Sequence, residues 1–322
     1  MLNYPIKFTP ILKEKLWGGS KLKDVLHKYS FKDNIGESWE ISDVQNEVSM
    51  VANGFLKGKS LKYLVENYKG DLVGNIIYKK FGTNFPLLIK FIDAKQNLSI
   101  QVHPNNELSF KRHQCFGKTE MWYVMQADKN AQLILDFNKK INPTTYQELV
   151  DKKEIMSVLN NVPVSKGDSF FIETGTIHAI GAGVLLAEIQ QTSDITYRIF
   201  DFDRVDDEGN ERELHTEQAI DAINFEPFST EKIGYDQKIN KLNKLVSCEF
   251  FKTNVLPVEG TIELDYTTID SFVIFMCVEG NAAISIFGNK EMLNYGETIL
   301  IPANAQKVQI IGKNCKLLEV TI

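Results

Sequence analysis

Short apolar runs separated by glycine turns recur along the whole of this 322-residue chain. The runs are rich in β-branched, leucine and aromatic residues, a composition typical of buried β-strands. Many short strands with turn signals between them are typical of sandwiches and barrels closed from two sheets. The sequence therefore predicts a mainly β fold. The clearest runs are residues 85–94, 120–127, 131–137, 183–190, 271–280 and 296–303.

Three segments interrupt this pattern and predict short helices. In each one, apolar residues at helical spacing follow a residue type that caps helix N-termini. One of them also carries proline at the first helical position, which favours a helix start. The segments are residues 60–68 behind Ser60, residues 142–160 behind Asn142 with Pro143 next, and residues 215–225 with Thr216 as the cap.

Two segments far apart in the chain resemble each other. Residues 167–178 and 296–307 both begin with glycine and an acidic residue, continue as an apolar strand and end in a turn. A matching pair of strands precedes each segment, over residues 122–135 and 274–287. This internal repeat predicts two jelly-roll units in one chain.

The two copies differ at the residues that carry chemistry. The first copy ends in His178, where the second has Lys307, and the second has no Gln-x-His pair and no counterpart of Glu120. We therefore expect a catalytic domain over residues 1–240, which includes the short helices. A second domain over residues 241–322 is expected to be jelly-roll-like and free of metal.

Composition narrows the class of protein. A net charge of −6 argues against general nucleic-acid binding, which needs a basic face. No stretch is apolar for long enough to be a signal peptide or a membrane span. The four cysteines form no C-x-x-C pair, which argues against a disulfide scaffold and for a reducing compartment. We expect a cytoplasmic protein that binds neither nucleic acid nor membranes.

A set of polar residues on predicted strands suits a metal ion. Gln101 and His103 stand two residues apart on one strand face, so their side chains can converge. Lys118 and Glu120 share a face of a second strand, and His178 follows a glycine turn. Two imidazoles, a carboxylate and an amide oxygen suit a divalent metal with an open position, and fit zinc. Spacing alone leaves structural roles open: hydrogen-bonded core histidines, a Lys118–Glu120 ion pair, or a surface-loop histidine.

The chain contains the motifs WGG (17–19), GESWEISD (36–43), LSIQVHP (98–104), GKTEMWYV (117–124), GTIHAIGAG (175–183) and EIQQTSDITYRIFDFDR (188–204). These six motifs together resemble the type I mannose-6-phosphate isomerase family, the cupin-type phosphomannose isomerases, in its short form. The resemblance runs from the N-terminus to about Asn224, and the last hundred residues match mainly in pattern. The motif K-P-E of the family is K-T-E here, with Thr119 for proline, which leaves Lys118 and Glu120 on one face.

This resemblance implies a cupin fold, one zinc ion per chain and a defined reaction. The metal ligands that it implies are Gln101, His103, Glu120 and His178, and it implies an active-site arginine at Arg198. The reaction would interconvert mannose 6-phosphate and fructose 6-phosphate, an aldose–ketose isomerisation through a cis-enediol. The partner would be a small sugar phosphate, and the protein would be a monomer or a homodimer.

The proton-shuttling base is left open among Lys118, Glu188 and a metal-bound water. Glu188 has an equal alternative as a salt-bridge partner or as a hydrogen-bond partner of a metal ligand. Arg198 would bind phosphate oxygens or an oxyanion. Its structural alternative is an ion pair with one of three acids. These acids are Asp194, Asp201 and Asp203. Lys90 would add to a positive pocket.

Three other functions compete with this prediction. A cupin dioxygenase would need an acidic residue near its first histidine, and the Gln-x-His pair is followed by Pro104 instead. A non-enzymatic sugar-binding protein should have lost a ligand or the arginine, and none is lost. An isomerase of a related aldose or aldose phosphate is the third alternative.

Overall fold

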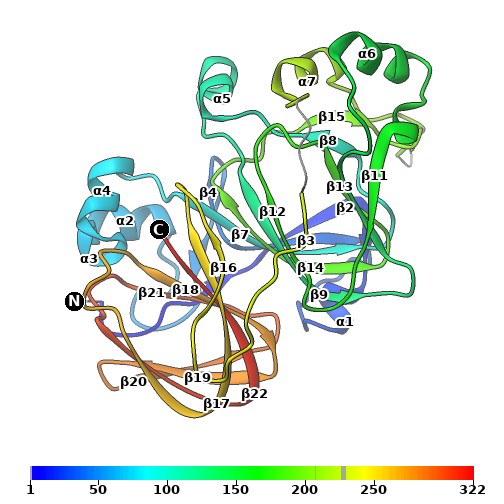
Figure 1. The fold of residues 1–322 in the computed structure, drawn as a ribbon. Helices are drawn as coiled ribbons and strands as arrows, with labels where there is room; N and C mark the ends of the chain where they lie inside the picture. Colours follow the sequence, from blue (N-terminus) through cyan, green and yellow to red (C-terminus); the bar gives the residue numbers. More distant parts are fainter. Residues whose placement is uncertain (1, 207, 226–229) are drawn as a thin grey trace.

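A computed structural model describes residues 2–206, 208–225 and 230–322, and it shows a mainly β chain built as two units (Figure 1). The first unit is a pair of facing antiparallel sheets. One sheet has the strand order β12 (Ser169–Ile172), β9 (Glu120–Ala127), β14 (Val184–Gln191), β7 (Leu87–Ala94), β2 (Ile11–Gly19) and β3 (Ile35–Ile41), with β3 also paired to β7. The other has the order β11 (Leu159–Pro163), β10 (Gln132–Phe137), β13 (His178–Ile180), β8 (Ile100–Val102) and β15 (Tyr197–Phe200).

Alternation along the strands decides which side chains lie between these two sheets. On β10, Leu133 and Leu135 point into the inner core and Ile134 points outward. On β14, Leu186 lies in the same inner core, whereas Ala187 lies in the core on the opposite face. This period of two is the expected geometry of a strand. It also means that polar residues at inward positions face the space between the sheets.

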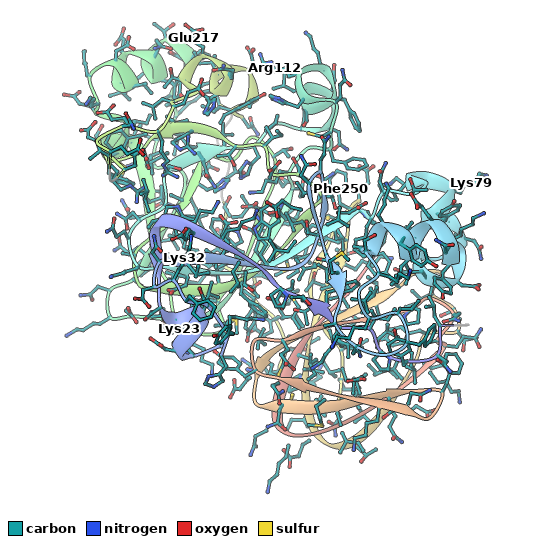
Figure 2. The ribbon with its side chains drawn as sticks, turned by 180° about the vertical axis from the view of Figure 1, so that it is seen from behind. Lys23, Lys32, Lys79, Arg112, Glu217 and Phe250 are labelled. Atoms are coloured by element: carbon teal, nitrogen blue, oxygen red, sulfur yellow. The ribbon has the colours of Figure 1, made fainter. Side chains whose placement is uncertain are left out.

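Helices cover the outer face of the five-stranded sheet. The α6 helix (Pro143–Asp151), the 3-10 turn η1 (Ile155–Val158) and α7 (Thr216–Ala222) pack Tyr146, Ile155 and Ala219 onto it. The α5 helix (Asn106–His113) stands beside α7, and Figure 2 shows Arg112 and Glu217 on these neighbouring helices. Arg112 pairs with Asp221 and donates a 3.3 Å hydrogen bond to the Gln218 carbonyl, which holds α5 in place.

The C-terminal unit repeats the strand order of the first. Its order β21, β18, β22, β17 corresponds to β12, β9, β14, β7, and β16 continues beyond β17. Its interior is a separate apolar core that includes Val273, Phe275 and Leu317. The predicted internal repeat is therefore present as a repeat of topology. The strands are β16 (Asn243–Ser247), β17 (Lys252–Asp265), β18 (Val273–Glu279), β19 (Asn281–Ile286), β20 (Asn289–Asn294), β21 (Thr298–Ile301) and β22 (Lys307–Thr321).

The remaining elements among the described residues are four short helices and two two-stranded ladders. The α2, α3 and α4 helices lie beside the C-terminal unit (Figure 1). None of the described helices is long and apolar enough to span a membrane. These elements are α1 (Lys21–Asp24), α2 (Leu61–Tyr68), α3 (Gly70–Val73), α4 (Asn75–Phe81), and the two-stranded ladders of β1 (Phe8–Thr9) with β6 (Met50–Val51) and β4 (Asp43–Val44) with β5 (Glu47–Val48).

Two of the three predicted helix caps are confirmed, whereas the predicted cap of α7 and the predicted end of α6 are wrong. Ser60 and Asn142 accept capping hydrogen bonds as expected, but α6 stops at Asp151 and the chain enters β11 at Leu159. The cap of α7 is His215 rather than Thr216, and its side chain makes no capping bond. The α5 helix, capped by Asn105, was not predicted, because few of its residues are apolar.

Besides the interior core of the C-terminal unit, a second apolar core contains residues of both units, and this leads to a stability prediction. Phe85 and Phe272 are fully buried, one from each unit, with ring centroids 4.6 Å apart. Phe272→Ala should lower the free energy of unfolding by about 3–5 kcal/mol, because it removes an aromatic ring without collapse of the cavity. Phe287→Ala, at a ring that is 55% exposed, is the control and should change it by less than about 0.5 kcal/mol. Denaturant titration measures both, and a loss below about 1 kcal/mol for Phe272→Ala would contradict a shared core. The division at residue 240 stays a prediction.

Candidate metal centre and active site

Three polar residues form a row across the inner face of the five-stranded sheet. His178 on β13 pairs in register with Gln101 on β8, and Gln101 pairs with Arg198 on β15. Residues opposite each other in a ladder point to the same face, so all three side chains face the six-stranded sheet. His103 follows directly after the end of β8. Opposite them, Glu120 opens β9.

The donor atoms of these residues lie at the spacing of a metal coordination sphere. His178 Nε2 lies 3.5 Å from Glu120 Oε1, and His103 Nε2 lies 3.7 Å from Glu120 Oε2. The Gln101 amide nitrogen lies 3.3 Å from His178 Nε2, and a half-turn of the amide presents the oxygen there instead. Ligands about 2.0–2.1 Å from a tetrahedral zinc ion are separated by about 3.4 Å. The donor set therefore fits a zinc-sized dication.

Backbone carbonyls orient both imidazoles. His103 Nδ1 lies 2.9 Å from the Ile195 carbonyl oxygen, and His178 Nδ1 lies 2.9 Å from that of Thr176. A carbonyl can only accept, so each Nδ1 carries the proton and each Nε2 presents its lone pair to the centre. Burial lowers the pKa of both histidines, that of His178 to about 4. Both rings are thus neutral, which is the form that binds metals.

Glu120 is buried with one cationic neighbour, Lys118, and without a hydrogen bond to either carboxylate oxygen from the described residues. Its side chain is completely buried, and neither oxygen accepts a hydrogen bond from any described residue. Burial raises the pKa of Glu120 to about 7, although the Lys118 ammonium 3.0 Å away opposes the rise. A buried charge is retained when it is paired or coordinates a metal. A dication among these donors would supply the missing charge, so the residues present fit the group that the sequence predicts.

A buried ion pair, Glu188 on β14 with Lys90 on β7, lies beside these donors on the six-stranded sheet. Glu188 accepts a 2.9 Å hydrogen bond from the Trp122 indole and lies 3.0 Å from the Lys90 ammonium. Burial opposes the charge of Glu188, but the ammonium groups of Lys90 and Lys118 outweigh burial and lower its pKa. Glu188 is therefore a carboxylate at neutral pH. Lys90 is itself buried, which its sequence context did not indicate.

A cavity of about 440 Å³ opens beside this cluster. Gln101, Lys118, Glu188 and Arg198 all line it, so the structure brings the predicted catalytic residues to one place. Six lysines and arginines line the cavity against four aspartates and glutamates, in a chain whose net charge is −6. An anionic ligand is therefore favoured here. The charged lining residues are Lys13, Lys15, Lys90, Lys118, Arg198, Arg212, Glu37, Glu47, Glu188 and Asp194.

Arg198 lies at the cavity without the ion pair that was its structural alternative. Asp201 instead binds Arg204 and Arg212, and Asp203 pairs with Lys153. The Arg198 guanidinium donates one 2.6 Å hydrogen bond to the Glu213 carbonyl, and its Nε is buried without a partner among the described residues. Burial lowers the pKa of Arg198, and the nearby Arg212 lowers it further. Arg198 is thus free to bind an anion.

Sequence reasoning missed the charged residues that β2 and β3 contribute to the cavity. Glu37 on β3 lies 3.0 Å from the Lys15 ammonium, and it accepts a 2.6 Å hydrogen bond from the Trp39 indole. The motif GESWEISD contained a usable signal, because Glu37 and Trp39 stand two residues apart on a strand and so share a face. Only the pairing of β3 with β7 shows which face that is.

Glu37 gives a prediction for acid stability. Burial opposes its charge, but Lys90, Lys15 and the Trp39 indole outweigh burial and lower its pKa from 4.5 to about 2. The unfolded chain then binds the proton more tightly than the folded chain. The stabilisation of about 3 kcal/mol is complete above pH 4.5 and is lost as the pH falls from 4.5 toward 2.

We therefore expect the difference in unfolding free energy between the wild type and Glu37→Gln to shrink as the pH falls from 6 to 3. Urea titrations at each pH measure it. Glu47→Gln alters a glutamate of the same cavity whose side chain is 37% exposed, and it should keep the wild-type pH dependence. Parallel curves for the wild type and Glu37→Gln would contradict this account of Glu37.

The fold and the donor set define the class of protein: a cupin with an imidazole, carboxylate and amide centre beside a cationic cavity. Comparison with known proteins identifies the family. The family model described as phosphomannose isomerase type I, catalytic domain, matches residues 6–154, and that described as mannose-6-phosphate isomerase, cupin domain, matches residues 241–322. The chain belongs to the type I mannose-6-phosphate isomerase family, a family of aldose–ketose isomerases.

Similar proteins match over nearly their whole length. The chain is 34% identical to mannose-6-phosphate isomerase ManA of Bacillus subtilis over 97% of each chain. It is 32% identical to the mannose-6-phosphate isomerase of Streptococcus mutans over 96% of this chain and 95% of the other. A crystal structure of the Bacillus subtilis mannose 6-phosphate isomerase superposes with a TM-score of 0.89 at 32% identity, covering 99% of this chain and 100% of the other.

Proposed function

We propose that this protein interconverts D-mannose 6-phosphate and D-fructose 6-phosphate with the help of one divalent cation, zinc in the first place. The observation that carries the proposal is that two oriented imidazoles meet the buried Glu120, whose oxygens accept no hydrogen bond from a described residue, beside a cationic cavity. Membership of the family supports the choice of substrate. Among aldose phosphates, the choice of mannose 6-phosphate rests on that membership alone.

Gln101, His103, Glu120 and His178 would hold the cation. A bound dication would stabilise negative charge on the substrate oxygens at C1 and C2. Imidazole and carboxylate donors also accept cobalt, manganese and iron, so zinc follows from the fit of the donor spacing and the family resemblance.

Glu188 is the residue that we assign to proton transfer. Its Oε2 is held by the Trp122 indole, and its Oε1 has no hydrogen bond from any described residue. The carboxylate would take the proton from C2 of the open-chain aldose and return it to C1, while the hydroxyl proton of O2 passes to O1, so that the substrate passes through a cis-enediol and the O2 hydroxyl becomes the ketose carbonyl. Lys90, 3.0 Å from Oε1, keeps the carboxylate charged before the transfer.

In this assignment, Lys118 and Arg198 bind the substrate and do not transfer the proton. The Lys118 ammonium lies 3.0 Å from both His103 Nε2 and Glu120 Oε2, so it orients the carboxylate and donates to a substrate hydroxyl at the cavity wall. Arg198 supplies a planar fork of donors for an anionic group.

The rate of fructose 6-phosphate formation from mannose 6-phosphate tests the proposal. The purified protein should turn over, lose activity in a chelator and regain it when zinc is added back. Glucose 6-phosphate, tested in parallel, should react at least about 10²-fold more slowly if the site discriminates at C2 by hydrogen bonds to the hydroxyl. Absence of turnover by folded, metal-replete protein would refute mannose 6-phosphate as the substrate. The cytoplasmic location and the monomeric or dimeric state stay predictions.

A further inference from the structure

We propose that Arg212, together with Arg198, forms the site that binds the phosphate group of the substrate, with Asp201 as the residue that positions Arg212. This inference rests on the proposed function and assigns the end of the substrate that the metal donors leave unassigned. Neither Arg212 nor Asp201 belongs to the predicted catalytic set.

The charges around Asp201 do not balance. Asp201 is 5% exposed and accepts two hydrogen bonds from Arg212, of 2.7 Å to Nε and 2.5 Å to Nη2. It also accepts a 2.5 Å hydrogen bond from Arg204. One carboxylate thus faces two guanidinium groups, and Arg198 adds a third that has no ion pair among the described residues. The cluster carries excess positive charge, which a dianion would neutralise.

Each arginine at the cavity keeps donors unused. The two bonds from Arg212 to Asp201 fix one edge of its guanidinium, and Nη1 is left without a hydrogen bond to any described residue. Arg198 uses Nη1 on the Glu213 carbonyl and leaves its buried Nε unpartnered. Both side chains line the same cavity. Arg212 also lowers the pKa of Arg198, the effect expected of two like charges held near each other.

Strand order places these arginines at the correct end of the cavity. His178, Gln101 and Arg198 occupy three successive strands in register, β13, β8 and β15. Neighbouring strands lie about 4.8 Å apart, so Arg198 stands about 10 Å from His178 across the sheet. Asp201 follows directly after the edge strand β15 and binds Arg212, which holds Arg212 at this edge of the sheet. A hexose phosphate bound through C1 and C2 at the metal donors would extend its sixth carbon along this row, toward the arginines.

The chemistry of the cluster selects phosphate over a carboxylate or a neutral group. Guanidinium groups bind phosphate oxygens through paired N–H donors, and a dianion matches the excess charge. Two carboxylates near these arginines would oppose the binding of a phosphate. Asp194 lines the cavity but is exposed, and the Glu213 side chain is 82% exposed, so water screens both.

Binding of an unreactive substrate analogue tests the assignment. Isothermal titration of zinc-loaded protein would use the alditol phosphate obtained by reducing mannose 6-phosphate, which lacks the carbonyl and cannot isomerise. The plain alditol is the second ligand. We expect Arg212→Gln to lower the affinity for the alditol phosphate by about 10- to 100-fold, because one charged hydrogen-bond donor to the phosphate is lost. The affinity for the plain alditol should fall much less. Lys153→Gln, at an exposed lysine that pairs with Asp203, is the matched control and should bind as the wild type does.

Steady-state kinetics give the second measurement. The KM of Arg212→Gln for mannose 6-phosphate should rise more than its kcat falls, since the phosphate contact is made in the ground state and in the transition state alike. If Arg212→Gln does not fold, Arg212→Lys replaces it: it keeps a charge but has no fork to bond both Asp201 and phosphate, and should weaken binding about 5- to 20-fold.

The possible outcomes separate this inference from the proposed function. Affinity of a folded Arg212 variant within twofold of the wild type, or equal losses for the alditol and its phosphate, would overturn the phosphate site. Turnover of mannose 6-phosphate by the wild type would at the same time leave the proposed function standing. Phosphate-dependent binding through Arg212 in a protein that never turns over mannose 6-phosphate would uphold the site and refute the substrate.

Discussion

Glu120→Gln should bind zinc poorly and lose at least about 10³-fold in kcat, because it removes the only charged ligand of the centre. The substitution keeps the shape of the side chain. It also removes a carboxylate whose burial costs more than the neighbouring Lys118 ammonium offsets, as its raised pKa shows. The metal-free variant should therefore be as stable as the metal-free wild type, or more stable. Zinc content after dialysis and the thermal midpoint in chelator measure the two effects separately.

Loss of zinc binding without loss of stability in the metal-free state is expected only of a metal ligand. A structural role for Glu120, as the partner of Lys118, predicts the opposite stability change, since its loss would leave a buried ammonium unpaired. His103→Ala should lose zinc and activity to a similar extent, and His27→Ala, at an exposed histidine that lines a different cavity, is the control. Normal zinc content and activity in Glu120→Gln would refute the centre.

Arg198→Gln should lower kcat/KM for mannose 6-phosphate by about 10²- to 10³-fold, the range found when one donor to a developing or bound negative charge is removed. Arg198→Lys should recover part of this loss, because it restores the charge but not the planar fork. The fold should survive both changes, since the Arg198 guanidinium makes one hydrogen bond, to a backbone carbonyl, and no ion pair with described residues.

Steady-state kinetics on metal-loaded variants check this prediction. The matched control is Arg112→Gln, which removes a guanidinium that pairs with Asp221 on α7 and does not line the cavity. Its kcat/KM should stay within a factor of about three. A comparable loss in Arg112→Gln would point to damage at the α5–α7 contact rather than to the cavity, and an unchanged Arg198→Gln would remove this residue from the active site.

Strand parity explains how much of the site could be predicted. Gln101 and His103 share a face because the side chains of a strand alternate, and the same rule placed Glu188 and Leu186 on one face of β14. Local rules also located the caps Ser60 and Asn142. The end of α6 was not predictable in this way, because the chain leaves the helix through Lys153 in the left-handed conformation (φ 56°), and no glycine marks that turn in the sequence.

The sequence by itself determined the mainly β fold, the repeat of two units and the four metal-ligand candidates. These features depend on periodicities and residue types that act within a few positions of the chain. The tertiary structure alone decided that Lys90 and Glu37 are buried beside Glu188, and that Asp201 binds Arg212 and Arg204 instead of Arg198. Ion-pair partners depend on the spatial separation and burial of charged groups on strands that are far apart in the sequence. Neither quantity can be inferred from spacing along the chain.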